Sequence, residues 1–256
     1  MSTHIKRREP AAPGSIPDVL GMFGAEVRFY REVAPVVGVR VPKCYRAEET
    51  ADGTLLVLED LSAWQPGADP AAAARILSGL HARWSGVAQS RWPWLRAGEA
   101  GVDLVAALYD RTWPDLAARR ELAAGALDLG ERLVGGVASA EAQASRVGPV
   151  TLTHGDASAS NMRTGPDGEI ALLDWEDVSA AAGVADLAWL LVSSVDPDRW
   201  DEVIAAYGPA AGLDDVLPAL AVQGLLSMAD SAPGSDAARG WVARLAATAA
   251  RLADHS

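Results

Sequence analysis

The stretch that most constrains this chain runs from residue 151 to residue 191. A short apolar strand leads into a His-Gly-Asp loop that ends at Asp156, and Asn161 follows five residues later. A Gly-Pro-Asp-Gly turn then leads into a second apolar strand, 170–173, which is followed directly by Asp174. Two carboxylates and a carboxamide are therefore delivered to the ends of two neighbouring strands.

This spacing suits the transfer of a phosphoryl group to a hydroxyl. One carboxylate, Asp156, can receive the hydroxyl proton, while Asn161 and Asp174 offer the hard oxygen ligands that magnesium prefers. An Asp-(four residues)-Asn loop followed by a strand that ends in a metal-binding Asp is also the protein-kinase pattern. Four fixed residues at this spacing arise by chance with a probability on the order of 10⁻³ in such a chain. The alternative is an ordinary hairpin in which Asp and Asn only cap backbone groups.

On these residues the stretch resembles the aminoglycoside phosphotransferase and choline kinase superfamily, whose loop reads His-Gly-Asp. The matching positions are His154, Gly155, Asp156, Asn161, Asp174 and Trp175. The segments MFGAEVRFYREVAP, PKCY, LVLEDL and LHARW are most similar to the ecdysteroid-kinase-like branch. The resemblance implies an α+β, two-lobed protein-kinase-like fold. Its truncated small β lobe would span residues 1–61, and its large, mainly helical lobe residues 62–256.

The resemblance also implies roles in catalysis and metal binding. Asp156 would be the catalytic base, or the residue that orients the acceptor hydroxyl, and Asn161 and Asp174 would hold Mg²⁺. His154 belongs to the same catalytic loop, where we expect it to support the loop by hydrogen bonding rather than to do chemistry.

Two further residues would support this site. Trp175 follows the metal-binding aspartate at a position that is Phe in protein kinases. Asp186 resembles a residue that braces the catalytic loop from the next helix, and it also fits a plain helix N-cap or first-turn acid.

Four positions in the first 61 residues would bind ATP. Lys6 resembles the strand lysine that contacts the α- and β-phosphates, and Glu26 resembles the helix glutamate that pairs with it. Glu59 and Leu61 lie in a segment that resembles the hinge between the lobes, where backbone groups bind adenine. The alternatives are that Lys6 is one more solvated base in a basic run, and that Glu59 is a solvated or helix-capping acid.

Local patterns predict the elements around these residues. We expect a strand over 3–8, a helix over 17–34, and a hairpin of strands 39–48 and 54–58. A further helix is expected to begin at Asp69-Pro70.

Aromatic and proline residues add expectations for the second half of the chain. His81 is expected to be a core histidine with one hydrogen bond, and Trp92 and Trp94 to lie in a loop that can expose them. Pro114 is expected to interrupt a helical region. The tail, 196–256, is expected to form three helices.

The net charge of the chain limits the classes of molecule that it is expected to bind. A formal net charge of −12 argues against nucleic acid and is compatible with a cationic small-molecule substrate, or simply with solubility. Six acids of the tail could make an acceptor pocket attractive to a cation, or could form a solvated face. They are Asp196, Asp198, Asp201, Glu202, Asp230 and Asp236.

Cysteine content and hydropathy indicate the cellular compartment in which the protein is expected. Cys44 is the single cysteine, which excludes an intramolecular disulfide and favours a reducing cytoplasm. No apolar run reaches the roughly 20 residues of a membrane span, so no membrane partner is expected.

One departure from the superfamily leaves two functions open. Only five residues precede Lys6, and they hold no glycine-rich hairpin to cover phosphates. The first reading is an ATP- and magnesium-dependent phosphotransferase that acts on an antibiotic or another metabolite, in antibiotic resistance or secondary metabolism. The second is a kinase-fold protein without kinase activity, either a small-molecule binding protein or an enzyme with different chemistry in the nucleotide cleft.

Overall fold

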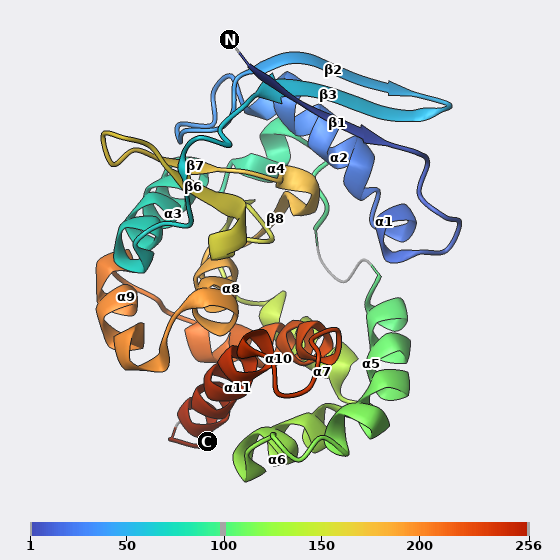
Figure 1. The fold of residues 1–256 in the computed structure, drawn as a ribbon, viewed down its shortest axis with the longest axis vertical. Helices are drawn as coiled ribbons and strands as arrows, with labels where there is room; N and C mark the ends of the chain where they lie inside the picture. The colour runs from blue at the N-terminus through green and yellow to red at the C-terminus, as the bar shows by residue number, and fades with distance from the viewer. Residues whose placement is uncertain (1, 98–100, 255–256) are drawn as a thin grey trace.

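The computed structural model describes residues 2–97 and 101–254. A small antiparallel sheet lies at one end of the molecule and a larger helical region at the other (Figure 1). The strands of the small sheet follow the order β1-β3-β2, with bounds β1 Thr3–Arg8, β2 Cys44–Thr50 and β3 Gly53–Glu59. The predicted α+β, two-lobed kinase-like architecture is therefore the one observed.

Alternation along β1 sets which side chains face the rest of the protein. Lys6 pairs with Leu56 of β3, and Leu56 is buried. Lys6 and Arg8 are partly buried, whereas Ile5 and Arg7 on the opposite face are exposed. The strand predicted over 3–8 is confirmed, and it presents two cations on one face.

The helix predicted over 17–34 is wrong as a single element. It is divided into α1 Ile16–Val19, α2 Met22–Arg28 and a π-helical turn Phe29–Val33. Gly21 separates the first two with a left-handed φ of 61°, a conformation that glycine adopts without steric cost. Only residues 22–33 therefore form the helix that packs beneath the sheet.

The first strand of the predicted hairpin begins later than expected. Pro42 and Lys43 precede β2, which starts at Cys44. Arg40 instead forms an isolated bridge with Ala171, so this part of the chain is paired with another region of the molecule.

Long helices form the larger lobe. The first of them follows Asp69, whose side chain accepts a hydrogen bond from the backbone N–H of Ala72 at 2.9 Å, and the predicted start at Asp69-Pro70 is confirmed. The helices are α3 Pro70–Trp84, α4 Ala88–Arg91, α5 Val102–Ala117, α6 Ala124–Leu133, α7 Val137–Ala144, α8 Val184–Ser194, α9 Trp200–Tyr207, α10 Leu213–Ala229 and α11 Asp236–Asp254. The last three are the helices predicted for the tail.

Two expectations for this lobe are wrong. Helix α5 continues through Pro114, where Trp113 and Leu116 are buried, so packing outweighs the hydrogen bond that proline removes. Trp92 is buried rather than exposed, with its ring centroid 4.7 Å from that of Trp84.

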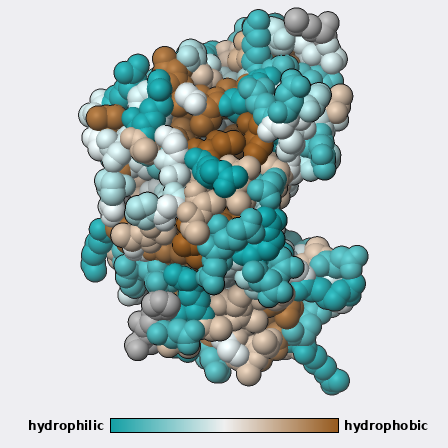
Figure 2. Space-filling view, turned by 90° about the vertical axis from the view of Figure 1, so that its left-hand side faces the viewer, coloured by the Kyte–Doolittle hydropathy of each residue, from teal (hydrophilic) through white to brown (hydrophobic). Residues whose placement is uncertain are grey.

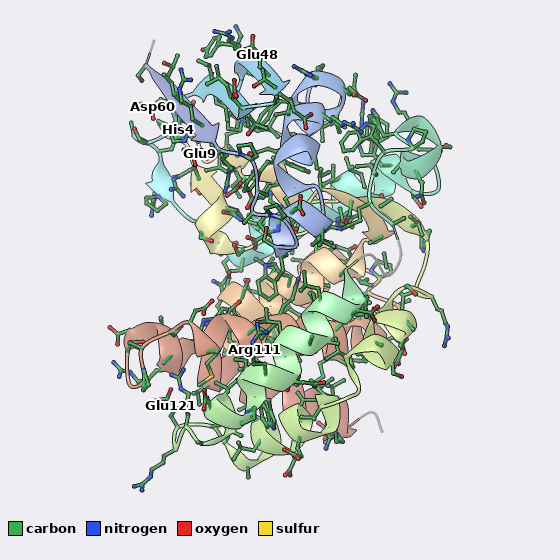
Figure 3. All side chains as sticks on the ribbon, turned by 90° about the vertical axis from the view of Figure 1, so that its right-hand side faces the viewer. His4, Glu9, Glu48, Asp60, Arg111 and Glu121 are labelled. Atoms are coloured by element: carbon green, nitrogen blue, oxygen red, sulfur yellow. The ribbon has the colours of Figure 1, made fainter. Side chains whose placement is uncertain are left out.

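The buried apolar residues form two clusters. The larger joins the small sheet, α3 and α8, and it contains Leu77, Leu152 and Leu187. The second joins α5, α6 and α7 to α10 and α11, around residues such as Leu129 and Leu245. In the view of Figure 3, the labelled Arg111 and Glu121 mark this helical end, and His4 and Asp60 mark the opposite, strand end.

A strand pair and a small three-stranded sheet hold the segment that the sequence singled out. One pairs β5 with β8, and the other places β6 between β4 and β7. Their bounds are β4 Gln65–Pro66, β5 Val150–Thr153, β6 Met162–Thr164, β7 Ile170–Leu172 and β8 Ser179–Ala182. The face shown in Figure 2 is hollowed in its upper half, where apolar surface gathers. Within the described ranges, no helix combines the length and apolarity needed to cross a membrane.

Candidate active site

Asp156 lies in the loop after β5, and donors from two other segments hold its carboxylate. Asn161 Nδ2 donates to Asp156 Oδ2 at 2.7 Å and to the Asp156 backbone oxygen at 3.0 Å. Trp189 Nε1, from α8, donates to Asp156 Oδ1 at 2.5 Å. Because both oxygens accept hydrogen bonds, the carboxylate has a fixed orientation. Sequence reasoning missed Trp189, since nothing in a helical tryptophan marks it as a partner of Asp156.

Lys6, Glu26 and Asp174 meet although they come from β1, α2 and the end of β7. Lys6 Nζ lies 2.7 Å from Glu26 Oε2 and 2.5 Å from Asp174 Oδ1. Asp174 has a left-handed φ of 58°, which is uncommon for a residue with a side chain and aims its carboxylate at the lysine. The structure thus joins three residues that the sequence proposed separately.

A second acidic and basic pair flanks this group. Arg8 makes an ion pair with Glu176, and Lys6 Nζ lies 3.5 Å from the same carboxylate. Carboxylate oxygens of Glu26, Asp174 and Glu176 lie within 4.8 Å of one another, close enough to share one cation. Sequence reasoning did not assign Glu176 or Arg8 to the site, although both lie two residues from a proposed site residue.

The protonation behaviour of these groups follows from burial and mutual repulsion. Burial raises the pKa of Glu26 to about 7, and the nearby Lys6 only partly offsets the shift. Burial, and then the charge of Asp174, also raise the pKa of Glu176. Burial works to lower the pKa of Lys6, but Glu26 and Asp174 outweigh it and raise that pKa. Three carboxylates thus face two cations, Lys6 and Arg8, in this cluster.

A cavity of about 420 Å³ opens beside this cluster and is called the Lys6 cavity here. Lys6, Glu26, Leu61, Asn161 and Asp174 are among the residues that line it. The lining of the cavity thus combines charged groups with the apolar Leu61.

Glu59 also borders the Lys6 cavity, but its side chain is engaged elsewhere. Its carboxylate accepts hydrogen bonds from Arg40 Nη2 at 2.7 and 2.8 Å and from the backbone N–H of Lys43 at 3.0 Å. These bonds lower the pKa of Glu59 against the opposing effect of burial. The side chain of Glu59 is thus structural, which leaves its backbone as the part that can contact a ligand.

His154 and Trp175 link the His-Gly-Asp loop to the π-helical turn that follows α2. His154 Nε2 lies 2.8 Å from the backbone oxygen of Leu173, and its ring centroid lies 4.4 Å from that of Trp175. Trp175 stacks on Phe29 at 4.1 Å with an interplanar angle of 8°. Phe29 was not identified from the sequence, because an apolar helix residue gives no sign of which ring it will meet.

Asp186 supports the loop from α8. It accepts hydrogen bonds from the backbone N–H groups of His154, at 2.7 Å, and Gly155, at 2.9 Å. His81 Nε2 lies 3.0 Å from Asp186 Oδ2, and His81 Nδ1 lies 2.9 Å from the hydroxyl of Tyr207. Although burial opposes it, the hydrogen bond with His81 lowers the pKa of Asp186. His81 is buried as expected, but both of its ring nitrogens have partners rather than one.

Gly155 allows the loop to pass close to the segment after Asp174. Its φ is 86°, and a Cβ atom on it would lie 2.2 Å from the backbone oxygen of Asp177. A side chain cannot be accommodated there, so steric exclusion explains why the middle residue of the His-Gly-Asp loop is glycine.

Comparison with solved structures defines the class of protein. The choline kinase LicA from Streptococcus pneumoniae is 18% identical, with 98% of this chain and 86% of that chain covered and a TM-score of 0.60. The aminoglycoside phosphotransferase APH(3'')-Id from Streptomyces rimosus, in complex with ADP and streptomycin, is 19% identical, with 88% and 87% covered and a TM-score of 0.58. LicA in complex with AMP gives 16% identity, 90% and 80% coverage and a TM-score of 0.55. Likeness at these identities establishes the fold, which is protein-kinase-like.

The family follows from the sequence itself. Residues 7–222 match the phosphotransferase enzyme family, so the chain belongs to that family. The resemblance to the aminoglycoside phosphotransferase and choline kinase superfamily is thereby confirmed, while its ecdysteroid-kinase-like branch remains a prediction. A search of curated protein sequences found no significant match.

Proposed function

We propose that this protein is an ATP- and magnesium-dependent O-phosphotransferase that moves the γ-phosphoryl group of ATP to a hydroxyl of a small molecule. The observation that carries the proposal is the Lys6–Glu26–Asp174 cluster at the Lys6 cavity, with Asn161 in the same wall. This is the donor set that nucleotide phosphates and a divalent cation require.

The residues present fit a divalent cation. Carboxylate oxygens of three residues lie within 4.8 Å of one another beside Lys6 and Arg8, so the cluster is rich in hard oxygen donors and has one more carboxylate than cations. In our proposal Asp174 and Asn161 hold Mg²⁺, and Glu176 is placed to assist. Bound Mg²⁺ would neutralise the charge of the phosphate oxygens.

The chain's own residues orient the reactants. Lys6, held by Glu26, would bind phosphate oxygens, and the hinge backbone from Glu59 to Leu61 would receive the adenine. Asp156, held by Asn161 and Trp189, would orient the acceptor hydroxyl and accept its proton. His154, Trp175 and Asp186 would keep the loop in position, without contact with the reacting atoms.

Nucleotide binding by similar proteins supports the cofactor. The Streptomyces rimosus enzyme was solved with ADP and streptomycin, and LicA with AMP. For this chain the proposed acceptor is a hydroxylated small molecule, such as an antibiotic or another metabolite, and the proposed location is the cytoplasm. The net charge of −12 would steer a cationic acceptor toward the protein, but long-range steering does not decide which molecule fits.

The second candidate is a kinase-fold protein that does not transfer phosphate. One observation favours it: Lys6 and Arg8 already neutralise Asp174 and Glu176, so the cluster is internally paired. A nucleotide and its metal would have to compete with these ion pairs for the same carboxylates.

Calorimetry with ATP separates the two candidates. We expect ATP to bind only with Mg²⁺, and Asp174→Ala to abolish this binding. Asp167→Ala, at an exposed turn, is the matched control and should bind ATP as the unaltered protein does. An absence of binding at millimolar ATP and Mg²⁺ would rule out the phosphotransferase. Binding without any phosphorylated product would favour the second candidate.

A further inference from the structure

The two partly buried cations of β1, Lys6 and Arg8, lie on the same face of the strand. Residues two apart on a strand share a face and are separated by about 6.6 Å along it. Thr3 of β1 is opposite Glu59, where the proposed hinge begins. Arg8 is opposite Thr54, near the other end of β3. Lys6 lies between these ends, so Arg8 is the cation further from the hinge.

Both cations contact one atom of Glu176. Lys6 Nζ lies 3.5 Å from Glu176 Oε2, and Arg8 Nη2 donates a hydrogen bond to that same oxygen. The Glu176 carboxylate is also one of the three whose oxygens lie within 4.8 Å of one another. Arg8 is not among the described residues that line the Lys6 cavity, and it is connected to the proposed nucleotide site through Glu176.

Glu176 engages only part of the guanidinium of Arg8. Arg8 Nε is buried and has no hydrogen-bond partner among the described residues. Arg199 shows the complete arrangement elsewhere in this protein, because its Nε and Nη2 donate to the two different carboxylate oxygens of Glu202, each at 2.9 Å. The same edge of Arg8 therefore retains a donor that an anion with more than one oxygen could use.

Phe23 of α2 supports the guanidinium from one side. Arg8 Cζ lies 4.5 Å from the centroid of the Phe23 ring, which is within the range of a cation–π contact. The side chain of Arg8 is 30% exposed, so it is held in place and is still open to a ligand. A planar cation that is already oriented loses little freedom when it binds an anion.

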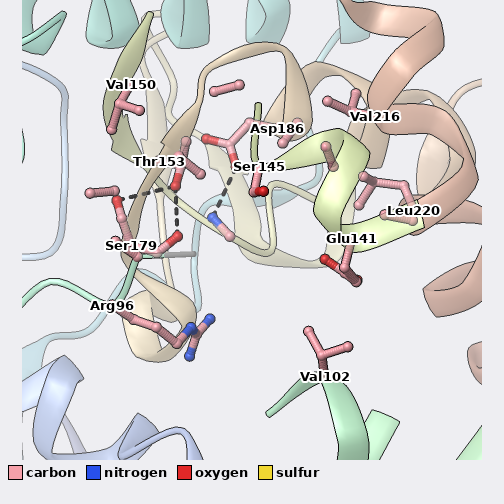
Figure 4. A pocket seen from close by; sticks show the side chains of 18 of the residues that line it. Arg96, Val102, Glu141, Ser145, Val150, Thr153, Ser179, Asp186, Val216 and Leu220 are labelled. Atoms are coloured by element: carbon pink, nitrogen blue, oxygen red, sulfur yellow. Dashed lines mark hydrogen bonds between the residues drawn. The ribbon is translucent and has the colours of Figure 1, made fainter. Parts of the chain in front are cut away.

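The other cavity beside the His-Gly-Asp loop is less suited to a phosphate. It has a volume of about 410 Å³ and lies between the β5–β8 pair and α10 (Figure 4). Among the described residues of its lining the only cation is Arg96, whose Nη2 lies 3.3 Å from Asp177 Oδ1. The carboxylates of Glu141 and Asp186 belong to the same lining. The phosphates of a nucleotide are therefore expected at the Lys6 cavity.

A terminal phosphate suits the edge of Arg8 better than the carboxylate of Glu176 does. It has three oxygens that are not shared with a second phosphorus, so it can accept from Nε and Nη2 and still bind a divalent cation. If the base of a nucleotide lies at the proposed hinge and its inner phosphates lie at Lys6, the next cation along β1 meets the last phosphate. That cation is Arg8.

We propose that Arg8 binds the terminal phosphate of ATP, and that Glu176 occupies its guanidinium while the nucleotide is absent. This inference rests on the proposed phosphotransferase function. A divalent cation held by Asp174 and Glu176 would compete with Arg8 for the Glu176 carboxylate, which would leave the guanidinium edge to the phosphate. Arg8 would then favour ATP over ADP, because ADP lacks the group that Arg8 binds.

Calorimetry with ATP and with ADP, both at saturating Mg²⁺, tests the role of Arg8. Arg8→Met removes the guanidinium, and Arg8→Lys keeps the charge beside Glu176 but loses the two-donor edge. Arg7→Met is the matched control, since it removes the same charge from the adjacent residue, which is exposed on the opposite face of β1. Urea unfolding shows whether each variant is folded.

We expect Arg8→Met to weaken the binding of ATP by about tenfold and that of ADP by less than about twofold. Arg8→Lys should weaken ATP binding to a smaller extent and leave ADP binding unchanged, and Arg7→Met should change neither. If Arg8→Met does not fold, the ratio of the two affinities in Arg8→Lys decides.

Two outcomes would overturn the role of Arg8 and leave the phosphotransferase proposal intact. One is unchanged ATP affinity in the folded Arg8 variants, and the other is equal weakening of ATP and ADP binding. If the unaltered protein bound neither nucleotide, both the role of Arg8 and the proposed function would fail.

Discussion

His81 and Asp186 form a buried pair in which His81 Nε2 lies 3.0 Å from Asp186 Oδ2, across 105 residues of sequence. The same Asp186 oxygen accepts a hydrogen bond from the backbone N–H of His154, which begins the His-Gly-Asp loop. The position of the loop before Asp156 is thus connected to α3 through one carboxylate. His81 therefore acts as a positioning residue, since it reaches the loop only through Asp186.

The first prediction concerns this pair. His81→Leu removes a donor from a buried carboxylate, and leaving such a group unsatisfied costs about 1–3 kcal/mol. We expect the turnover of ATP to fall by about tenfold or more, with the affinity for Mg-ATP unchanged, because the loop and not the Lys6 cavity is disturbed. His81→Gln, which can still donate, should recover part of kcat. Equal kcat values in both variants and in the unaltered protein would contradict this role.

The second prediction concerns pH. The pKa of Glu26 is about 7 in the folded protein and 4.5 as an ordinary value, so the folded state binds the proton more tightly. Protonation of Glu26 therefore stabilises the folded state. This stabilisation is fully present below pH 4.5 and is lost as the pH rises through 7. Glu26→Gln should remove a pH-dependent change of about 3 kcal/mol. Urea unfolding at pH 5 and pH 7.5 measures it.

A control for this titration is Glu9→Gln, which alters an exposed loop acid instead. Its change in unfolding free energy between the two pH values should match that of the unaltered protein. An identical pH dependence in Glu26→Gln would show that Glu26 does not titrate in this range.

The third prediction concerns Glu176 and the metal. Because its carboxylate lies within 4.8 Å of those of Glu26 and Asp174, Glu176→Gln removes one negative charge from the proposed cation site. We expect the Mg²⁺ concentration that supports half-maximal ATP binding to rise by about tenfold. Glu48→Gln, which breaks an exposed pair with Arg46, is the matched control. Titration of Mg²⁺ at fixed ATP gives both values, and a similar shift in both variants would contradict a local role.

The fourth prediction concerns the stacked rings of Phe29 and Trp175. Phe29 is fully buried, and its replacement by alanine should lower the free energy of unfolding by about 3–5 kcal/mol. Phe23→Ala changes a partly exposed ring on the same helix, which stacks against Arg8, and should cost much less. Urea unfolding compares the two. A loss below about 1 kcal/mol in Phe29→Ala would mean that the stack does not anchor the helix of residues 22–33.

Local spacing was enough to predict which residues of the 151–191 stretch come together. Asp156 and Asn161 lie five residues apart, and the turn before Asp174 holds the intervening strands together, so short-range pattern and final geometry coincide. Helix starts such as Asp69-Pro70 were predictable for the same reason, because a cap is a contact between near neighbours.

Long-range partners were not predictable. Trp189 and Asp156 are 33 residues apart, and the partners of His81 are 105 and 126 residues away, so no periodic pattern connects them. The predicted continuous helix through residue 21 and the predicted interruption at Pro114 were wrong for different reasons. At Gly21 a left-handed backbone interrupted an apolar stripe, and at Pro114 tertiary packing outweighed an unfavourable residue.

The left-handed backbone of Asp174 has a consequence for how this protein can change. Glycine, and to a smaller extent asparagine, adopts that conformation more readily, so the backbone alone would favour either residue at this position. Glycine would also remove the carboxylate that faces Lys6, and asparagine would remove its charge. Conformational ease of the backbone and the charge of the cluster therefore make opposite demands on this one position.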